Sequence, residues 1–497
     1  MWPDGPGVAD RLCSPRADLL TEQVADDGAF SQVTGPVSTY ERHVTHDGQA
    51  WRETTRYRLA IPWFGWLFAW PVRMVLARRL SRLWWAPPDH ITPRNALVLG
   101  LLAAASMSSA FTNTLFTQTA KFAADDFGIG NSGVGVAGAV VRAGIIITIP
   151  FAVMSDRIGR RRVMRLMAWL APLVTAMGAL APNFSFLVAT QAIGRPLGLA
   201  LDFLIAVVAA EEMPRNSRAY AVSLMAMASG LGAGIAVMAL PLADLGDSGW
   251  RLVYVVTLVW LVVAVDITRR LPETRRFERH HHQHHHHVNP AFDRRRFAVL
   301  AAIVVFANFF VAPAAFFQNS YLRDIRGYDA STIAIFTLVT ATPAGLGLVV
   351  GGRLADVRGR RMMIATSLPL ATALIVGSYA IGGPPMWLAA FGGGFLGGIA
   401  YPALAVYRAE LVPTGNRGKA AGFLTVAALL GGIVGLLLVG RLLDAGSSFA
   451  AVISLVAVGQ LVVVGIVLAW LPETAHRELE DLNPQDRLNP PPAPAGP

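Results

Sequence analysis

The stretch that decides the fold is Asp156–Arg162, which reads Asp-Arg-Ile-Gly-Arg-Arg-Arg. A close copy, Asp356–Arg361, follows about 200 residues later and reads Asp-Val-Arg-Gly-Arg-Arg. Long apolar runs flank both copies. A charged loop that recurs between apolar segments predicts a membrane module that is present in two copies along the chain.

Two more motifs recur at nearly the same spacing. The copies pair Glu211–Pro214 with Glu410–Pro413, Arg218 with Arg417, and Leu271–Thr274 with Leu471–Thr474. The last pair reads Leu-Pro-Glu-Thr in both places. Because all three motifs keep one order and one spacing, they indicate two halves of the same design.

Composition places most of the chain in a membrane. Of its 497 residues, 54% are hydrophobic and 15% are charged, and the mean hydropathy is +0.47. A soluble domain carries about 25% charged residues, so water is not the solvent for most of this chain. The net charge of +10 does not indicate nucleic acid, because the arginines gather in short loops beside apolar segments, where they set membrane orientation.

Twelve segments are long and apolar enough for spanning helices, which need about 20 residues each. We expect them near 96–120, 132–154, 163–181, 185–209, 219–241, 250–268, 297–319, 331–352, 362–382, 386–408, 418–440 and 449–470. The predicted fold class is an all-α membrane protein with twelve transmembrane helices in two pseudo-symmetric six-helix bundles.

Loop charges predict the orientation of these helices. Arginines such as Arg157 and Arg269 lie between the second and third helices and after the even-numbered ones. The alternate loops carry acids such as Asp125 and Asp244. By the positive-inside rule, both termini and the central loop face the cytoplasm. We expect a multi-pass protein of a plasma membrane, here a bacterial inner membrane.

The polar region before the first helix carries two further signals. Residues 37–46 and 49–60 alternate in polarity around Asp47-Gly48, which predicts a β-hairpin. Residues 61–85 mix five tryptophans with arginines, which favours an amphipathic helix in the headgroup region. An unspecific apolar connector and a thirteenth span are the alternatives.

These features divide the chain into five parts. They are a cytoplasmic extension (1–90), a first six-helix bundle (91–272), a His/Arg-rich central loop (273–296), a second bundle (297–474) and a disordered proline-rich tail (475–497). The central loop contains His280–His287. A solvated linker with adventitious metal affinity and a metal sensor are both open interpretations of this tract, and we expect no structured metal site.

The paired motifs resemble those of the major facilitator superfamily, over roughly residues 91–475. Their Glu-x-x-Pro and Pro-Glu-Thr blocks are similar to the sugar-porter and metabolite–proton-symporter branches. The first helix lacks the acidic residue that proton-coupled sugar porters typically carry. The fifth helix lacks the Gly-Pro pair of drug–proton antiporters. The resemblance therefore implies the fold and leaves the substrate open.

The repeated charges define a candidate gating motif at the cytoplasmic ends of the helices. Its members are Asp156, Arg157, Gly159, Arg160, Arg161, Glu211, Arg218, Glu273, Asp356, Gly359, Arg360, Arg361, Glu410, Arg417 and Glu473. We expect them to form an ion-pair network between the two bundles that biases the conformational equilibrium. The alternative is that the arginines serve only membrane topology.

Three ionisable residues fall inside predicted spans, where charge is expensive and usually functional. Arg142 lies midway along the second helix, and Arg195 and Asp202 lie on the fourth. Arg195 resembles the fourth-helix arginine that the superfamily associates with proton coupling. Asp202 is the candidate proton carrier, and a permanent structural link between Asp202 and either arginine is the equal alternative. The surplus positive charge favours an anionic substrate.

Polar side chains predict a substrate cavity at the membrane midplane between the first and seventh helices. The candidates are Asn113, Thr117, Gln118, Gln191, Asn308, Gln318 and Asn319. Small polar residues also hold membrane helices together, so we expect part of this set to contact substrate.

The expected function is proton-coupled movement of a small polar or anionic metabolite by alternating access. Efflux of a drug or amphiphile and a non-transporting membrane sensor are the two alternatives. The sequence contains no recognisable catalytic triad, paired catalytic carboxylates or phosphate-binding loop, so we expect neither an enzyme nor a cofactor. The expected partners are a small-molecule substrate, protons and membrane lipids, without nucleic acid, and the expected state is a monomer.

Overall fold

A computed structural model describes residues 2–3, 5–25, 29–79, 86–87, 89–214, 217–273, 293–412 and 417–475. The histidine tract and nearly all of the central loop and C-terminal tail that the sequence predicts lie outside these ranges. So does the end of the predicted interfacial segment.

Twelve helical stretches among the described residues are long and apolar enough to cross a membrane, which confirms the predicted number. In the first half they are α3 (Pro93–Asp126), α4 (Asn131–Ala143) with η1 (Gly144–Ile147) and α5 (Thr148–Ile158), α6 (Arg160–Ala176) with η2 (Met177–Leu180), α7 (Phe184–Glu212), α8 (Arg218–Met238) followed by η4 (Leu240–Asp244), and α9 (Trp250–Val256) with η5 (Thr257–Trp260) and α10 (Leu261–Arg270). In the second half they are α12 (Arg294–Phe316) with α13 (Gln318–Asp324), α14 (Ala330–Arg358), α15 (Arg360–Ala380), α16 (Gly383–Glu410), α17 (Arg417–Asp444) and α18 (Phe449–Trp470).

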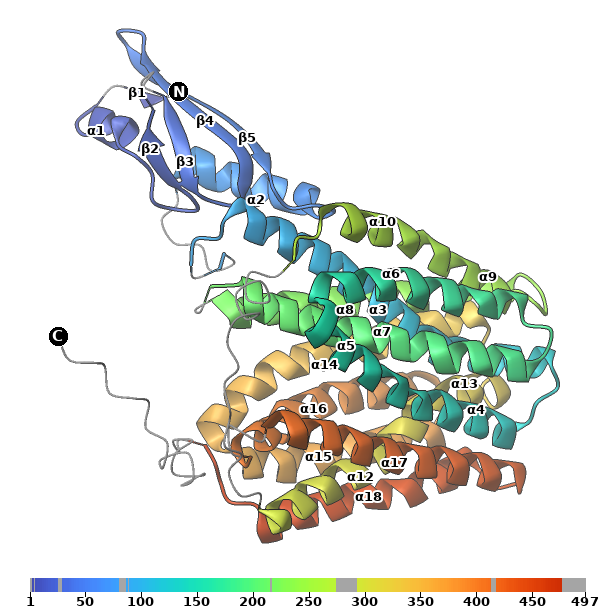
Figure 1. The fold of residues 1–497 in the computed structure, drawn as a ribbon. Helices are drawn as coiled ribbons and strands as arrows, with labels where there is room; N and C mark the ends of the chain where they lie inside the picture. The colour runs from blue at the N-terminus through green and yellow to red at the C-terminus, as the bar shows by residue number, and fades with distance from the viewer. Residues whose placement is uncertain are drawn as a thin grey trace.

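The helices form two bundles that lie side by side with their axes roughly aligned (Figure 1). At one end the bundles share a single apolar core, which includes Phe116 and Tyr254 from the first half and Phe316 and Leu436 from the second. At the other end each bundle has a core of its own. We call these the closed end and the extension end, because the N-terminal region packs at the latter.

The same backbone turn links the second to the third helix and the eighth to the ninth. Gly159 joins α5 to α6 with φ 102°, and Gly359 joins α14 to α15 with φ 94°. A side chain at either position would be strained in this left-handed region. A Cβ atom on Gly359 would also lie 2.8 Å from the Glu473 carboxylate. Glycine in the repeated motif is therefore a backbone requirement.

The N-terminal extension is a five-stranded antiparallel sheet with two helices. Its elements are β1 (Trp2–Pro3), α1 (Val8–Cys13), β2 (Thr21–Val24), β3 (Phe30–Thr34), β4 (Val37–His46), β5 (Ala50–Leu59) and α2 (Gly65–Arg78). The strand order is β1-β5-β4-β3-β2. The hairpin of β4 and β5 around Asp47-Gly48 confirms the prediction, whereas the other three strands were not predicted.

One face of α2 covers the sheet through Val72, Val75 and Leu76, which pack on Leu20 and Val37. The other face leaves Trp66 and Trp70 exposed at 77% and 70%. A helix therefore exists over Gly65–Arg78, within the predicted segment, and its place in the headgroup region stays a prediction. Its contact with the sheet explains why it is apolar on two faces.

The extension docks on the first bundle only, as far as the described residues show. The indole Nε1 of Trp63 donates to Oδ2 of Asp266 on α10 at 3.0 Å. Pro62 packs directly on Gly100 of α3, where a Cβ would lie 2.5 Å from the proline ring. The lack of a side chain at Gly100 is therefore what lets the chain approach α3.

Candidate functional site

Arg142 and Arg195 lie at equal depth in the first bundle. Arg142 is eleven residues from the start of α4 at the closed end, and Arg195 is eleven residues from the start of α7 at the same end. At about 1.5 Å per residue, both lie roughly 16 Å from that end. The 3-10 segment η1 begins just after Arg142. The sequence-based expectation of similar depth agrees with this placement.

Arg142 reaches the interface between the bundles. A Cβ atom built on Gly432 of α17 would lie 2.9 Å from its Nη1 atom. The guanidinium therefore rests against the backbone of a helix from the other half. The positive charges of Arg142 and Arg195 repel each other, and both residues are only partly buried.

No ion pair joins either arginine to a carboxylate among the described residues. Arg195 Nε is buried without a hydrogen-bond partner in this part of the chain. Two arginines at midplane depth without a counter-charge in the described part of the chain are costly, and such groups mark substrate or ion pathways. The arrangement is therefore suited to an anion that enters from outside the protein.

Asp202 lies on α7, seven residues and about 10 Å beyond Arg195 toward the extension end. Its carboxyl group lies near the Ser109 hydroxyl of α3. The same hydroxyl donates to the Gly198 carbonyl oxygen at 2.7 Å and accepts from Asn113 Nδ2 at 3.3 Å. In the described structure Asp202 forms no ion pair with Arg142 or Arg195, so this conformation does not contain the permanent link.

The predicted substrate-binding residues fall into separate places. Asn113 lies against Gly198 of α7 and donates to the Ser109 hydroxyl, and its Oδ1 is buried without a partner among the described residues. Gln191 is fully buried, and its Nε2 donates to the Thr175 carbonyl oxygen of α6 at 3.2 Å. The structure therefore places Asn113 against the helix that carries Arg195 and Asp202, and Gln191 in the interior of the first bundle.

On the first and seventh helices, Gln118 and Asn319 meet each other. Asn319 Nδ2 donates to the backbone oxygen and to Oε1 of Gln118 at 2.9 and 3.0 Å. Asn308 donates to the Val304 carbonyl oxygen of its own helix at 3.0 Å. Thr117 and Gln318 directly precede the two members of this pair in the sequence, and both are half-buried. Gln118 and Asn319 thus close the two bundles on each other in this conformation.

Ion pairs reinforce this closure between α3 and α13. Lys121 Nζ lies 2.7 Å from Asp324 Oδ1. Arg323 Nε donates to Asp125 Oδ2 at 2.7 Å. The hydrogen bonds and ion pairs that the structure describes between the bundles gather at the closed end.

Two aspartates also cap helices of the opposite bundle. Asp444 at the end of α17 accepts from the backbone N–H groups of Asn131 and Ser132 at 2.9 and 2.8 Å. Asp244 at the end of η4 accepts from those of Ala330 and Ser331 at 2.8 and 2.9 Å. Carboxylates stabilise helix N-termini by satisfying free N–H groups and by opposing the helix dipole.

These caps were missed from the sequence, where Asp244 served only as a loop charge. The spacing of these residues along the sequence is a signal for the caps. Asp244 and Asp444 are 200 residues apart, and so are the capped Ser331 and Asn131. A search for repeated acids in the loops, alongside the repeated arginines, would have found the pair.

At the extension end the repeated motif forms contacts within each half. Arg160 Nη2 lies 3.3 Å from Glu211 Oε1, and Arg360 Nη1 is paired with Glu410. Each of these two ion pairs joins the third helix of a half to the fourth helix of the same half. They therefore do not form the expected network between the bundles. The side chains of Asp156, Arg157, Arg218, Asp356 and Arg417 lie outside what the structure describes.

The glutamates of the Pro-Glu-Thr blocks cap the helices that follow the glycines. Glu273 Oε1 accepts from the Arg161 N–H at 3.2 Å. Glu473 accepts from the N–H groups of Arg360 and Arg361 at 2.9 and 3.0 Å. Burial opposes ionisation of Glu473, but hydrogen bonds from four backbone N–H groups outweigh it and hold the pKa of its carboxyl group below the ordinary 4.5.

The fold is similar to those of several solved transporters. A bacterial homologue of the human lysosomal transporter Spinster, in an inward-facing and unoccupied conformation, matches with a TM-score of 0.59 and 19% identity, over 76% of this chain and 94% of that one. The nucleoside transporter NupG matches with a TM-score of 0.62 and 12% identity, over 75% and 99%. The inward-open xylose transporter XylE from E. coli matches with a TM-score of 0.61 and 17% identity, over 78% and 97%.

The sequence carries the same relationship independently of the structure. The profile of the Major Facilitator Superfamily matches residues 100–356 and, in a second match, residues 298–494. The two matches together cover most of the chain and both of its halves. With twelve apolar helices in two bundles and the repeated charged turns at their ends, this chain belongs to the major facilitator superfamily.

Proposed function

We propose that this superfamily member is a secondary active transporter that moves a small anionic metabolite across the plasma membrane in exchange for, or together with, protons. The observation that carries the proposal is the pair Arg142 and Arg195, which lie at one depth without a carboxylate partner among the described residues. An arginine fork binds a carboxylate with two parallel hydrogen bonds. One anion between the two guanidinium groups would neutralise their repulsion.

Asp202 is the proposed proton carrier. It lies about 10 Å beyond Arg195 along α7, has the Ser109 hydroxyl nearby, is partly exposed, and forms no ion pair among the described residues. A carboxyl group in this position can exchange a proton without first breaking an ion pair. Substrate at the arginines and a proton at Asp202 would then be coupled through α7, the helix that carries both Arg195 and Asp202.

Alternating access is supported by the contrast between the two ends of the bundles. The closed end joins both halves through a shared core and the caps of Asp244 and Asp444. At the extension end the cores are separate. With the orientation that the loop arginines predict, the closed end faces outward and the conformation is open toward the cytoplasm.

The test is a thermal-shift screen of the purified protein against metabolites at acidic and neutral pH, because a ligand of the native state raises its apparent stability. We expect carboxylates to stabilise the protein, and Arg142→Ala to abolish this effect. Thr342→Ala is the matched control, since Thr342 stands 200 residues after Arg142 and donates only to the Leu338 carbonyl oxygen of its own helix. Stabilisation by hydrophobic cations alone would overturn the proposal and favour efflux.

A further inference from the structure

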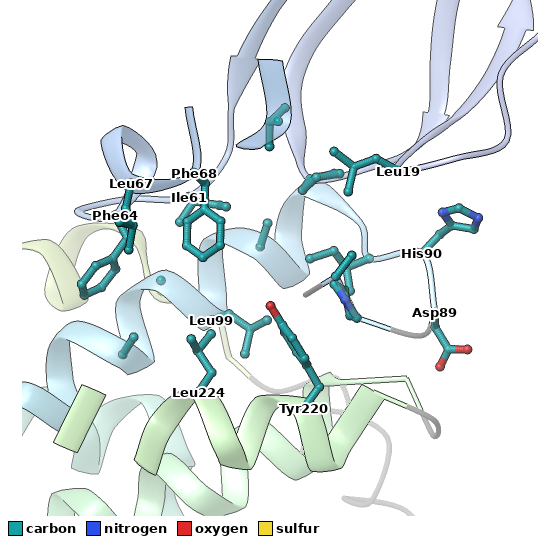
Figure 2. A pocket seen from close by; sticks show the side chains of 18 of the residues that line it. Leu19, Ile61, Phe64, Leu67, Phe68, Asp89, His90, Leu99, Tyr220 and Leu224 are labelled. Carbon is teal, nitrogen blue, oxygen red and sulfur yellow. The ribbon is translucent and has the colours of Figure 1, made fainter. Parts of the chain in front are cut away.

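A pocket separates the N-terminal extension from the first bundle. Its volume is about 620 Å³, within the range of about 300–1,000 Å³ that is usual for pockets that bury a small ligand. One wall comes from the extension, with Ile61, Phe64 and Phe68. The opposite wall comes from the groove between α3 and α8, with Leu99 and Leu224 (Figure 2).

The pocket follows α8 inward from the headgroup level. Tyr220 lines it at the start of the helix and Leu231 lines it eleven residues later. This run corresponds to roughly 16 Å along the helix, about half of the ~30 Å thickness of a bilayer's hydrocarbon core. The length and depth of the pocket therefore match one leaflet.

The lining of the pocket reaches the surface of the protein. Two of its lining residues, Met227 and Leu231, are 68% and 57% exposed on a membrane-spanning helix. Beside it, α2 exposes Trp66 and Trp70, and tryptophan is enriched at membrane–water interfaces. Hydrocarbon chains of the bilayer therefore have direct access to the pocket.

One polar group points into this apolar space. Figure 2 shows the Tyr220 ring projecting from α8 into the pocket. The described residues provide no hydrogen-bond partner for its hydroxyl, whereas Asp89 and His90 lie at the polar rim. A phenol hydroxyl at this depth, just below the rim, can donate to an ester carbonyl oxygen, the acceptor that lies between the headgroup and the acyl chains of a phospholipid.

We propose that the pocket between α2 and the α3–α8 groove holds one acyl chain of a membrane phospholipid, with the Tyr220 hydroxyl on its ester carbonyl. The bound lipid joins the extension to the first bundle beside the direct contacts of Pro62 and Trp63. Its binding is independent of the transported substrate, because the lining of the pocket does not include Arg142, Arg195 or Asp202.

The test is photocrosslinking of the full-length protein in nanodiscs with a phosphatidylethanolamine that carries a diazirine on one acyl chain. We expect labelled peptides from 61–72, 96–103 and 220–231. Ala228→Leu adds bulk to the pocket wall, and we expect it to lower this labelling by about tenfold, since each methylene displaced removes buried apolar contact. Tyr220→Phe removes one hydrogen bond, and we expect a loss of about two- to tenfold.

Ala427→Leu is the matched control, because Ala427 occupies the corresponding position of α17, 199 residues after Ala228. It should label as the unchanged protein does. Both leucine variants are first checked for an unchanged elution profile and helical circular dichroism. If Ala228→Leu misfolds, the labelling of Tyr220→Phe alone tests the proposal. Equal labelling of the unchanged protein and the folded pocket variants, or labelling spread evenly over both bundles, would overturn the proposal.

Discussion

The two halves of the chain are alike where they turn and different where they carry charge inside the membrane. Both have a left-handed glycine, an arginine–glutamate pair and a capping glutamate at the extension end. At midplane depth the likeness ends. The first half has Arg142, Arg195 and Asp202 where the second half, 199 or 200 residues later, has Thr342, Gly394 and Tyr401.

This difference distinguishes residues with a structural role from residues with a functional role, and it does so without any knowledge of the substrate. Residues kept in both halves hold helix ends in place, and that need is the same in each half. Residues found in one half only have no such shared task. Because charges inside a membrane are costly, the three unmatched ones are the strongest candidates for function.

The largest effect is expected at Asp202. Asp202→Asn removes the ionisable group, and an amide cannot carry the proton. A pH difference of about 1 unit supports an about tenfold concentration ratio, so we expect pH-driven accumulation in proteoliposomes to fall by about that factor, while exchange of substrate between the two sides remains.

Tyr401→Phe, at the matching position of the second half, is the control and should accumulate substrate normally. Accumulation that survives in Asp202→Asn would refute proton transfer at this residue. Loss of both accumulation and exchange would assign Asp202 a structural or binding role instead.

The next effect is expected at the arginines. A hydrogen bond to a charged group contributes about 1.5–3 kcal/mol, so Arg142→Ala and Arg195→Ala should each weaken binding of the carboxylate found in the screen by about 10- to 150-fold. If both hold one anion, the double variant should lose less than the sum of the two single losses. Titration calorimetry measures the affinity of the two single variants and of the double variant. Strictly additive losses of binding free energy would mean that the two arginines have separate roles.

A smaller effect is expected from the capping glutamates. Glu473 accepts four backbone hydrogen bonds, and Glu273 accepts one from the Arg161 N–H. Loss of a cap costs about 0.5–2 kcal/mol, so Glu473→Gln and Glu273→Gln should each lower the Tm by a few degrees. A lower Tm in one variant only would show that the two halves do not depend equally on this cap.

The same carboxylate gives a pH dependence. Because folding lowers the pKa of Glu473, its ionised form stabilises the native state at pH values above the unfolded pKa of about 4.5. That stabilisation is lost as the pH falls through the lower folded pKa. We expect Tm to drop on acidification below about pH 4.5, and to drop less in Glu473→Gln. Identical acid profiles for the two proteins would contradict this assignment.

The smallest effect is expected where the extension meets the first half. Trp63→Phe removes the hydrogen bond to Asp266, worth about 0.5–1.5 kcal/mol. Hydrogen exchange should then rise in β5, α2 and α10. The matching helix of the second half, α18, contacts no part of the extension that the structure describes and should not change. Increased exchange in both helices would indicate global rather than local loosening.

Much of the fold was predictable because its signals are local. Each span is a long apolar run, and the hairpin of β4 and β5 follows from alternation around Asp47-Gly48. The strands β1, β2 and β3 have two to five residues each. Strands this short show too little alternation to be recognised, and they depend on pairing with the longer hairpin.

The candidate site was predictable only in part. Helix geometry predicted similar depths for Arg142 and Arg195, since depth along a helix depends only on residue count, and the helix bounds agree with that prediction. Which way a polar side chain faces depends on its neighbours. Gln191 therefore packs on α6, and Gln118 and Asn319 bond to each other. The Asp244 and Asp444 caps join residues that are distant in sequence, so no local sequence pattern predicts them.

The exchanged caps at the closed end have a consequence for how such a chain can arise. Asp244 reaches Ser331, and Asp444 reaches Ser132 and Asn131. This is the reciprocal pattern of a two-fold interface between identical subunits, in which residue i meets j and j meets i. A single half paired with its own copy already has both partners of the contact. Fusion of two such copies into one chain would have kept the interface intact, and left each half free to lose or gain charges of its own.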